Sequence, residues 1–247
     1  KDLMETMPFY AVKGSPINET PLGFFSESDA EVFLSEYGIP RRYLTSIPSP
    51  WAAKRLREHR GDLSEFTIVK LYPSALNQIA ITNIEPGDEN NQDISTLVGK
   101  LNIRKMDEYD QNDTDAYSYS GGLCLSQSGL LNFSEMFKAP IKLLNPLLTA
   151  TQDGTYNGTE AIGAIPYDGV VLAHSNESEW KSFSNNKTNE AFLDRVNIVK
   201  VPYSLRTSAE ERIYQKFINA SSLKDAPKDK YVLKIAAWFA VLSRLFE

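Results

Sequence analysis

Cysteine and histidine are scarce in this chain of 247 residues, and their scarcity excludes several kinds of site. Cys124 is the single cysteine, so neither an internal disulfide nor a cysteine cage for a metal can form. The two histidines, His59 and His174, are too far apart for a His-x-x-x-His zinc motif. Residues 110–121 lack the glycine and the glutamate that an EF-hand requires at fixed positions. The sequence therefore predicts no metal held by a cluster of protein ligands.

Long apolar runs and an excess of positive charge are missing too. No stretch approaches the roughly 18 apolar residues of a membrane span, and the N-terminal residues lack the pattern of a secretory signal. The net charge of −6 argues against a dominant surface for nucleic acids or anionic membranes. Two local basic patches, at 41–42 and 54–57, remain candidates for contact with an anionic partner. The alternative is that each is a solvated helix face. We therefore expect a cytoplasmic protein without nucleic-acid or membrane partners.

The motifs of several enzyme classes are also absent. The chain has no Gly-x-x-x-x-Gly-Lys-Ser/Thr phosphate loop and no Gly-x-Ser-x-Gly nucleophile elbow. It has no His-Arg-Asp, Asp-Phe-Gly or Val-Ala-Ile-Lys element, so its own residues predict no conventional protein-kinase machinery. Hydrophobic residues make up 42% of the chain and charged residues 23%, which is typical of one large domain or a domain with a subdomain.

Three short stretches, in a fixed order, carry the functional signal. An apolar run from Gly129 onward ends in Glu135. A second run, from Val170 onward, ends in Asn176, and Arg195 stands just before a third. Polar side chains at the carboxyl ends of buried parallel strands line the crevice in which α/β proteins bind ligands. The order predicts a nucleotide-hydrolysis core, and we expect the chain to begin just after the missing phosphate loop.

Local patterns predict the helices and strands around these stretches. Helices are expected at 28–37, 51–59, 138–151, 178–194 (with a break at 184–189), 207–219 and 230–245, and a short one from Ser74 to Ile81. Strands are expected at 8–13 and 66–72, and residues 165–173 read as a hairpin that leads into a buried strand. The acidic stretches 85–93 and 107–115 are expected to form loops.

A change of pattern near Tyr203 predicts two domains. Residues 1–203 would form an α/β core with an insertion at about 85–115, and residues 204–247 would begin a small helical lid. In the last helix, apolar residues at helical spacing are expected to face inward, namely Val232, Ile235, Ala236, Phe239, Leu242 and Leu245.

Seven longer stretches make the chain resemble the bacterial PrkA family. They span nearly the whole chain in the family's order, at 37–43, 85–95, 135–141, 147–152, 156–160, 173–180 and 189–195. The family is described as serine protein kinases that carry an AAA+ ATPase module and a further C-terminal region. The chain is similar to that module without its phosphate loop and without the C-terminal region. The kinase activity is implied by this resemblance alone.

The resemblance implies a fold, cofactors and partners. The fold is the α/β P-loop type of the AAA+ proteins, with a three-layer parallel-sheet core and a small C-terminal helical lid. ATP and Mg²⁺ are the implied cofactors, although the fragment alone would bind them weakly, since phosphate-loop amides supply the main anion contacts. The implied partners are a protein substrate and further copies of the chain in a ring, in a stress response.

The resemblance also assigns 130–135 to the Walker B strand, which usually ends in Asp-Glu. Here the pair is Ser134 and Glu135. Phosphoryl transfer needs a neutralising metal and a positioned water. Glu135 would polarise the water, whereas Ser134 is a weak substitute for the aspartate that supports Mg²⁺. The alternative for Glu135 is an acid favoured by the dipole at a helix start.

Three further residues receive implied roles. Asn176 matches the sensor-1 position, with an N-cap of the following helix as its alternative. Arg195 matches an arginine finger offered to the neighbouring subunit, which can be worth roughly 10³–10⁵ in rate. Its alternatives are an ion pair with Asp194 or a cation at a helix C-terminus. Arg244 lies where a sensor-2 arginine is found, with a solvated side chain as the alternative.

A second function belongs to a different class. Because Ser134 replaces the Walker B aspartate, the chain would also suit a degenerate AAA+ module that does not hydrolyse ATP and serves as a platform for protein assembly. Hydrolysis that depends on Glu135 distinguishes the two.

Overall fold

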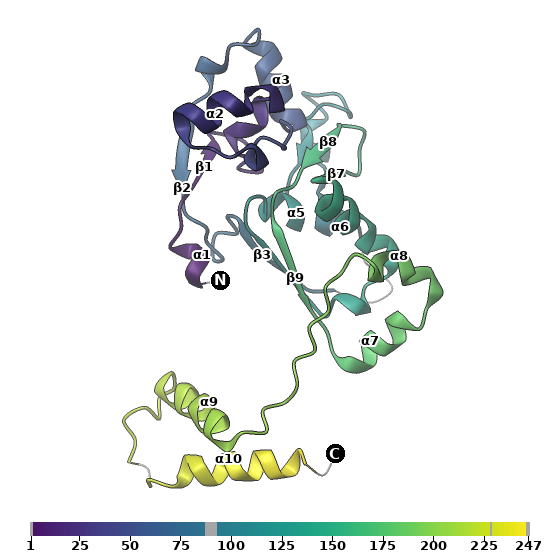
Figure 1. Ribbon diagram of the computed structural model, residues 1–247. Helices are drawn as coiled ribbons and strands as arrows, with labels where there is room; N and C mark the ends of the chain where they lie inside the picture. Colours follow the sequence, from purple (N-terminus) through teal and green to yellow (C-terminus); the bar gives the residue numbers. More distant parts are fainter. Residues whose placement is uncertain (1, 87–92, 228, 246–247) are drawn as a thin grey trace. The chain divides into compact units, whose positions relative to one another are not determined.

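A parallel sheet of three strands runs through the larger of the two units into which the chain divides, residues 1–196 and 197–247 (Figure 1). The computed structural model describes residues 2–86, 93–227 and 229–245. The strand order is β3 (Ile81–Ile84), β6 (Leu130–Ser134) and β9 (Val170–His174). Since β6 pairs in parallel with both neighbours, it is the central strand, and the predicted α/β class is confirmed. Most of the loop expected at 85–93 lies outside the described residues.

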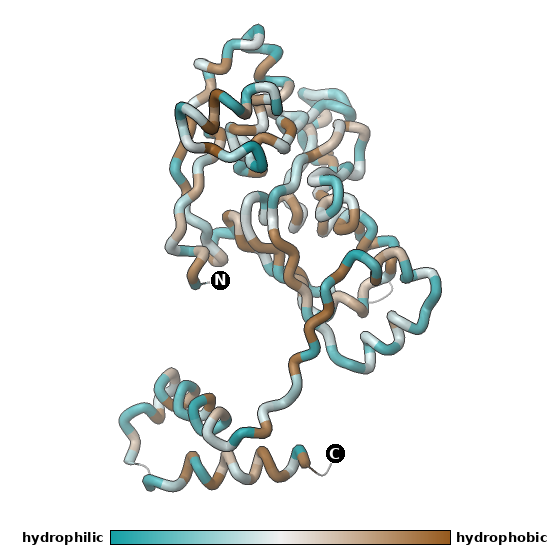
Figure 2. Tube along the Cα trace, viewed as in Figure 1, coloured by the Kyte–Doolittle hydropathy of each residue, from teal (hydrophilic) through white to brown (hydrophobic). Residues whose placement is uncertain are grey.

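Two helices, α5 (Gly122–Leu125) and α6 (Ile141–Asp153), share an apolar core with this sheet. Leu131 and Phe133 of β6 are fully buried in that core. They stand on the same side of the strand, because side chains alternate between the two faces of a sheet. Figure 2 shows the strands of the sheet as largely apolar segments (brown). The prediction of a buried strand at the end of 165–173 is wrong, however, since Val170 and Leu172 of β9 are 63% and 56% exposed.

The start of β6 depends on a glycine. The backbone N–H of Leu130 donates to the carbonyl oxygen of Ala80 at 2.7 Å, where β3 and β6 begin to pair. A Cβ atom at Gly129 would lie 1.7 Å from that oxygen. Any larger residue would therefore push the two strands apart.

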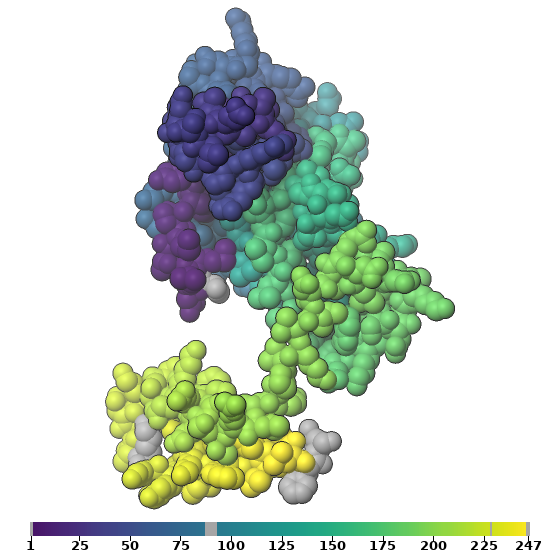
Figure 3. Space-filling view, viewed as in Figure 1, coloured from purple at the N-terminus to yellow at the C-terminus, as the bar shows by residue number. Residues whose placement is uncertain are grey.

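An antiparallel strand pair and three helices form the N-terminal part of the first unit. The strands are β1 (Phe9–Val12) and β2 (Ile68–Leu71), and the helices are α1 (Asp2–Glu5), α2 (Ala30–Tyr37) and α3 (Pro50–Glu58). Helix α2 ends because Gly38 has a φ of 67°, the left-handed conformation that stops helices. Pro50 opens α3, as predicted. In the space-filling view these elements (purple and dark blue) pack against the teal and green remainder of the unit (Figure 3).

Short elements complete the first unit. Two antiparallel pairs join β4 (Lys100–Leu101) to β5 (Tyr117–Ser118) and β7 (Thr155–Asn157) to β8 (Ala164–Pro166). The remaining α-helices are α4 (Ser95–Val98), α7 (Glu177–Ser184) and α8 (Glu190–Leu193). The 3₁₀ helices are η1 (Pro21–Phe24), η2 (Glu27–Asp29), η3 (Arg41–Tyr43), η4 (Leu63–Glu65), η5 (Ile103–Lys105), η6 (Met136–Lys138) and η7 (Lys187–Asn189).

The second unit contains α9 (Thr207–Asn219) and α10 (Val232–Ser243), which pack against each other. The predicted inward face of α10 is wrong. The buried residues of α10 are Ala237 and Val241. All six residues of the predicted face are exposed instead, namely Val232, Ile235, Ala236, Phe239, Leu242 and Leu245. The domain boundary expected near residue 203 stays a prediction.

The helix expected from Ser74 to Ile81 is wrong. Ser74 forms an isolated antiparallel bridge with Ile79. Its hydroxyl also accepts a hydrogen bond from the backbone N–H of Asn77 at 3.2 Å. Such local side-chain bonds offer the backbone an alternative to a helix, and the segment turns into β3.

The hairpin expected at 165–173 is also wrong. Its two strands belong to different sheets, since β8 pairs with β7 and β9 pairs with β6. The backbone N–H of Asp168 donates to the side chain of Gln127 at 3.0 Å. The Asp-Gly pair thus turns the chain from one sheet to the other.

Candidate functional site

The carboxyl ends of β6 and β9 lie side by side. Ser134 and His174 are register partners at the last position of the two strands. The hydroxyl oxygen of Ser134 and Nε2 of His174 are hydrogen-bonded at 3.2 Å. The structure thus brings the end of the first predicted stretch next to the end of the second, at the edge where open α/β sheets bind ligands.

Glu135 follows β6 in a left-handed backbone conformation, with φ 50° and ψ 40°. Residues other than glycine adopt this conformation at a cost of about 1–2 kcal/mol. Such strain persists where the surrounding structure holds it, often at functional sites. The backbone turns sharply here and begins η6, so the Glu135 side chain leaves the strand at the sheet edge.

A lysine joins Glu135 to the helix that follows β9. The ammonium group of Lys138, at the end of η6, pairs with the Glu135 carboxylate. It also lies 3.4 Å from Oε1 of Glu179 on α7. The Glu135 hydrogen bond is the main cause that raises the pKa of Lys138. We call these three residues, Glu135, Lys138 and Glu179, the Lys138 bridge.

Asn176 is the N-cap of α7. Its side-chain oxygen accepts from the backbone N–H of Glu179 at 2.9 Å, which confirms the capping interpretation. Its amide group donates to Oε1 of Glu179 at 2.8 Å. Partial burial works to raise the pKa of Glu179, but hydrogen bonds from Ser175 and Asn176 and the charge of Lys138 lower it. Asn176 is therefore connected to Glu135 through the Lys138 bridge.

Arg195 is not part of this cluster of contacts. It follows α8, and its Nη1 donates to the backbone carbonyl of Ala191 in that helix. Its Nε donates to Oε1 of Gln152 at 2.6 Å. Together with Thr151 and Asp194, these side chains line a shallow depression at the end of α6. The contact with Ala191 agrees with the alternative of a cation at a helix C-terminus.

Arg244 belongs to the second unit, where it is paired rather than solvated. Its Nη1 lies 2.6 Å from Glu210 and 3.0 Å from the backbone oxygen of Ser204. Its guanidinium also lies 5.4 Å from the ring centre of Tyr203. These contacts tie the end of α10 to the start of α9.

Sequence reasoning missed Lys138 and Glu179. One signal for Glu179 was available, since an asparagine followed three residues later by glutamate has the spacing of a capping box. His174 is the last residue of β9. Its hydrogen bond to Ser134 depends on the pairing of two strands that are distant in the sequence.

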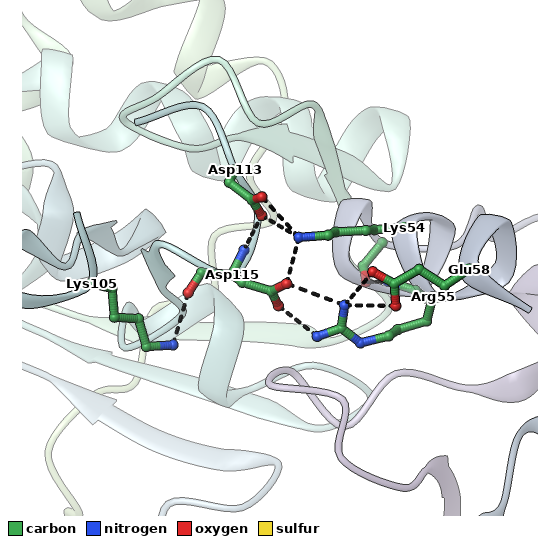
Figure 4. Close-up of polar contacts among 8 residues, drawn as sticks. Lys54, Arg55, Glu58, Lys105, Asp113 and Asp115 are labelled. Carbon is green, nitrogen blue, oxygen red and sulfur yellow. Dashed lines mark hydrogen bonds and ion pairs between the residues drawn. The ribbon is translucent and has the colours of Figure 1, made fainter. Parts of the chain in front are cut away.

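A second charged cluster occupies the basic patch at 54–57 (Figure 4). Nζ of Lys54 lies 2.7 Å from Asp113 and 2.6 Å from Asp115. Arg55 contacts the other oxygen of Asp115 at 2.8 Å. The acidic loop 107–115 thus docks on α3. The carboxylates of the loop neutralise the basic side chains of Lys54 and Arg55.

Metal clusters and membrane spans are absent from the part of the chain that the structure describes. Within residues 2–86, 93–227 and 229–245, no three His, Cys, Asp or Glu side chains gather in a way that would hold a metal ion. In the same ranges, no helix has the length and apolarity needed to cross a membrane.

The parallel sheet, with polar residues at the carboxyl ends of adjacent strands, defines an α/β protein whose strand ends form the candidate site. A family model described as PrkA AAA domain matches residues 1–247. The chain therefore belongs to the PrkA AAA domain family.

Two relatives show how the chain relates to longer proteins. It is 58% identical over 252 residues to the serine/threonine kinase YeaG of Escherichia coli strain K12, covering 100% of this chain and 39% of that protein. It is 36% identical over 240 residues to the ATP-dependent protease PrkA of Bacillus subtilis strain 168, covering 96% of this chain and 37% of that protein. The chain thus spans well under half the length of these relatives.

Two solved structures are similar at a lower level. The complex of the magnesium chelatase subunits BchI and BchD matches with a TM-score of 0.44 and 15% identity, over 99% of this chain and 60% of that chain. NtrX of Brucella abortus with bound ADP matches with a TM-score of 0.43 and 15% identity, over 67% of this chain and 36% of that chain.

Proposed function

We propose that this chain is the ATP-hydrolysing module of a PrkA-type serine protein kinase, in which hydrolysis is coupled to action on a protein substrate. The observation that carries the proposal is the meeting of two polar strand ends. Ser134 lies beside His174, and the strained residue Glu135 is linked to Asn176 through the Lys138 bridge. Family membership supports it, as do the two relatives, a serine/threonine kinase and an ATP-dependent protease.

The residues at the strand ends suit Mg²⁺ and ATP. ATP supplies the phosphoryl group, and Mg²⁺ neutralises the charge on its phosphates. Mg²⁺ is usually held by one or two protein carboxylates together with phosphate oxygens, so a small set of oxygen ligands is enough. The Ser134 hydroxyl at the end of β6 offers one such oxygen, and the phosphates of ATP supply others.

Each candidate residue has a role in this proposal. Glu135 polarises the attacking water, and Asn176 orients that water. Ser134 offers a neutral oxygen to the metal in place of the usual aspartate. Arg195 serves a neighbouring subunit as an arginine finger, which requires that its bond to Gln152 opens. Arg244 would act as sensor 2 from the helical unit.

The whole-protein context is part of the same proposal. We infer a homo-oligomeric ring, a cytoplasmic location and a place in a stress response. Residues 1–203 would form the core, and residues 204–247 the start of a small helical lid.

Substitution of the candidate water-polarising residue tests the function. Glu135→Gln keeps the size of the side chain and removes its basicity, so ATP turnover should fall by about 100-fold or more. Turnover is measured in a version of the protein that extends upstream through a phosphate loop. Glu31→Gln, the same change at an exposed position of α2, is the control and should retain turnover. Equal turnover in the Glu135 variant and the parent would contradict the proposal.

The second candidate function is a protein-assembly platform without hydrolysis. Ser134 at the position of the metal-supporting aspartate favours it. In that case the extended protein has no turnover for Glu135→Gln to remove. Calorimetry of the same two proteins with Mg²⁺ and ATP then reports whether nucleotide is bound at all.

A further inference from the structure

Lys138 is placed between two acidic side chains from different elements. Glu135 precedes η6 and is the candidate water-polarising residue. Glu179 lies on α7 and is held by Asn176, the candidate sensor. One ammonium group is therefore shared between the two candidate functional residues, directly on one side and through Glu179 on the other.

Aromatic packing beside Lys138 holds its backbone at a fixed place relative to α7. The ring of Phe137, its neighbour in η6, lies 4.6 Å from the ring of Phe183 on α7. It lies 5.2 Å from the ring of Trp180, which follows Glu179. These aromatic contacts hold η6 against α7, so Lys138 stays within reach of both carboxylates.

Glu179 is the better anchored of the two carboxylates. Its side chain is 16% exposed and accepts hydrogen bonds from Asn176 and Ser175, whereas the side chain of Glu135 is 39% exposed. A carboxylate that accepts from an ammonium group is turned toward that group. The Glu135 carboxylate is therefore less available to a water while Lys138 holds it.

We propose that Lys138 is a positioning residue that restrains Glu135 and couples it to Asn176. The proposal rests on the proposed function of the strand ends. Glu179 competes with Glu135 for the same ammonium group. A movement of Asn176 shifts Glu179, because the two side chains are hydrogen-bonded. The contact between the Lys138 ammonium group and Glu135 then changes as well.

The competition predicts opposite effects for two substitutions in the version that carries a phosphate loop. Lys138→Met frees Glu135 and should raise basal ATP turnover by about fivefold, equivalent to a modest change in the barrier. Glu179→Gln leaves the ammonium group to Glu135 and should lower turnover by a similar factor. A purely structural role would lower turnover in both variants. Lys181→Met, the same change on α7 at a lysine that pairs with Glu177, is the control and should leave turnover unchanged.

A second measurement needs no nucleotide. In the 247-residue chain with Trp51→Phe and Trp238→Phe, Trp180 is the remaining tryptophan and lies next to Glu179. Its fluorescence emission should change on Lys138→Met, and should stay constant on Lys181→Met. An unchanged emission in both would overturn the bridge.

The outcomes separate this inference from the proposed function. If Glu135→Gln leaves turnover intact, the proposed function fails. If Glu135→Gln abolishes turnover but Lys138→Met and Glu179→Gln both lower it, the function stands and the restraint by Lys138 is wrong.

Discussion

Glu19 is an acidic residue in a buried position, since the residue is 2% exposed. The backbone N–H and the hydroxyl of Ser49 donate to it at 2.7 and 2.6 Å, and the hydroxyl of Ser15 donates at 2.8 Å. Ser49 in turn caps α3 through the N–H of Ala52. The buried carboxylate thus joins the loop after β1 to the start of α3.

Glu19 gives a prediction about stability and pH. Burial raises the pKa of Glu19 above its ordinary value of 4.5, and the hydrogen bonds from Ser49 and Ser15 offset part of this. The folded state therefore binds this proton more tightly than the unfolded state. The contribution of Glu19 is fully present below the unfolded value and is lost as pH rises through the folded pKa.

Glu19→Gln removes both this titration and one acceptor oxygen. It should lower the free energy of unfolding by about 2 kcal/mol, because a buried donor loses its partner. The difference from the parent should shrink as pH rises above 4.5. Urea unfolding at several pH values measures it, with Glu65→Gln at an exposed position as the control. A difference that grows with pH would contradict the assignment.

At the scale of elements, the acidic loop 107–115 is attached to α3 by charge. The side chain of Asp115 is 11% exposed and meets both Lys54 and Arg55. Burial works to raise the pKa of Asp115, but hydrogen bonds from Lys54 and Arg55 and their charges lower it overall. Its contribution to stability is therefore present above the unfolded value of 3.8 and is lost as pH falls through the folded pKa.

Asp115→Asn should lower the free energy of unfolding by about 1.5 kcal/mol, since hydrogen bonds between charged groups are lost. The difference from the parent should persist in 1 M salt, because partly buried ion pairs are screened much less than exposed ones. Chemical denaturation at low and high ionic strength measures it. Asp107→Asn, at an exposed position of the same loop, should have no effect. Equal stability of the Asp115 variant and the parent would show that the loop is held by other contacts.

At the scale of the whole molecule, the role proposed for Arg195 depends on assembly. Within the described part of the chain, the side chain of Arg195 donates hydrogen bonds to Gln152 and Ala191. It is not hydrogen-bonded there to Ser134, Glu135 or Asn176. A finger that acts in a ring would instead serve the site of a neighbouring subunit.

Mixed subunits test this role. In the version with a phosphate loop, Arg195→Ala and Glu135→Gln should each abolish most ATP turnover. A mixture of the two variants should recover part of it, because some interfaces join an intact arginine to an intact Glu135. Turnover is measured across mixing ratios, with Arg206→Ala as a control subunit that should not change the result. No recovery at any ratio would count against the finger.

Local sequence patterns were sufficient for much of the fold. The stop of α2 and the start of α3 were predictable because Gly38 and Pro50 act on the backbone within a few residues. The range of α9 was predicted too, but its N-cap is Arg206 rather than Thr207, and no side chain caps it. Among the wrong predictions are the helix after Ser74 and the inward face of α10. At both places, packing against other elements determines the structure. Apolar spacing defines a helix face, but it does not say whether the large or the small side chains meet the partner helix.

By itself, the sequence determined the α/β class, the polar ends of β6 and β9, the N-cap at Asn176 and membership in the PrkA family, because these depend on local order or on resemblance. Only the tertiary structure decided which side chains meet. The pairing of Ser134 with His174, the Lys138 bridge and the docking of Asp115 on α3 join elements that are distant along the chain. Strand register and helix packing bring these groups within a few ångströms, and no spacing in the sequence encodes that proximity.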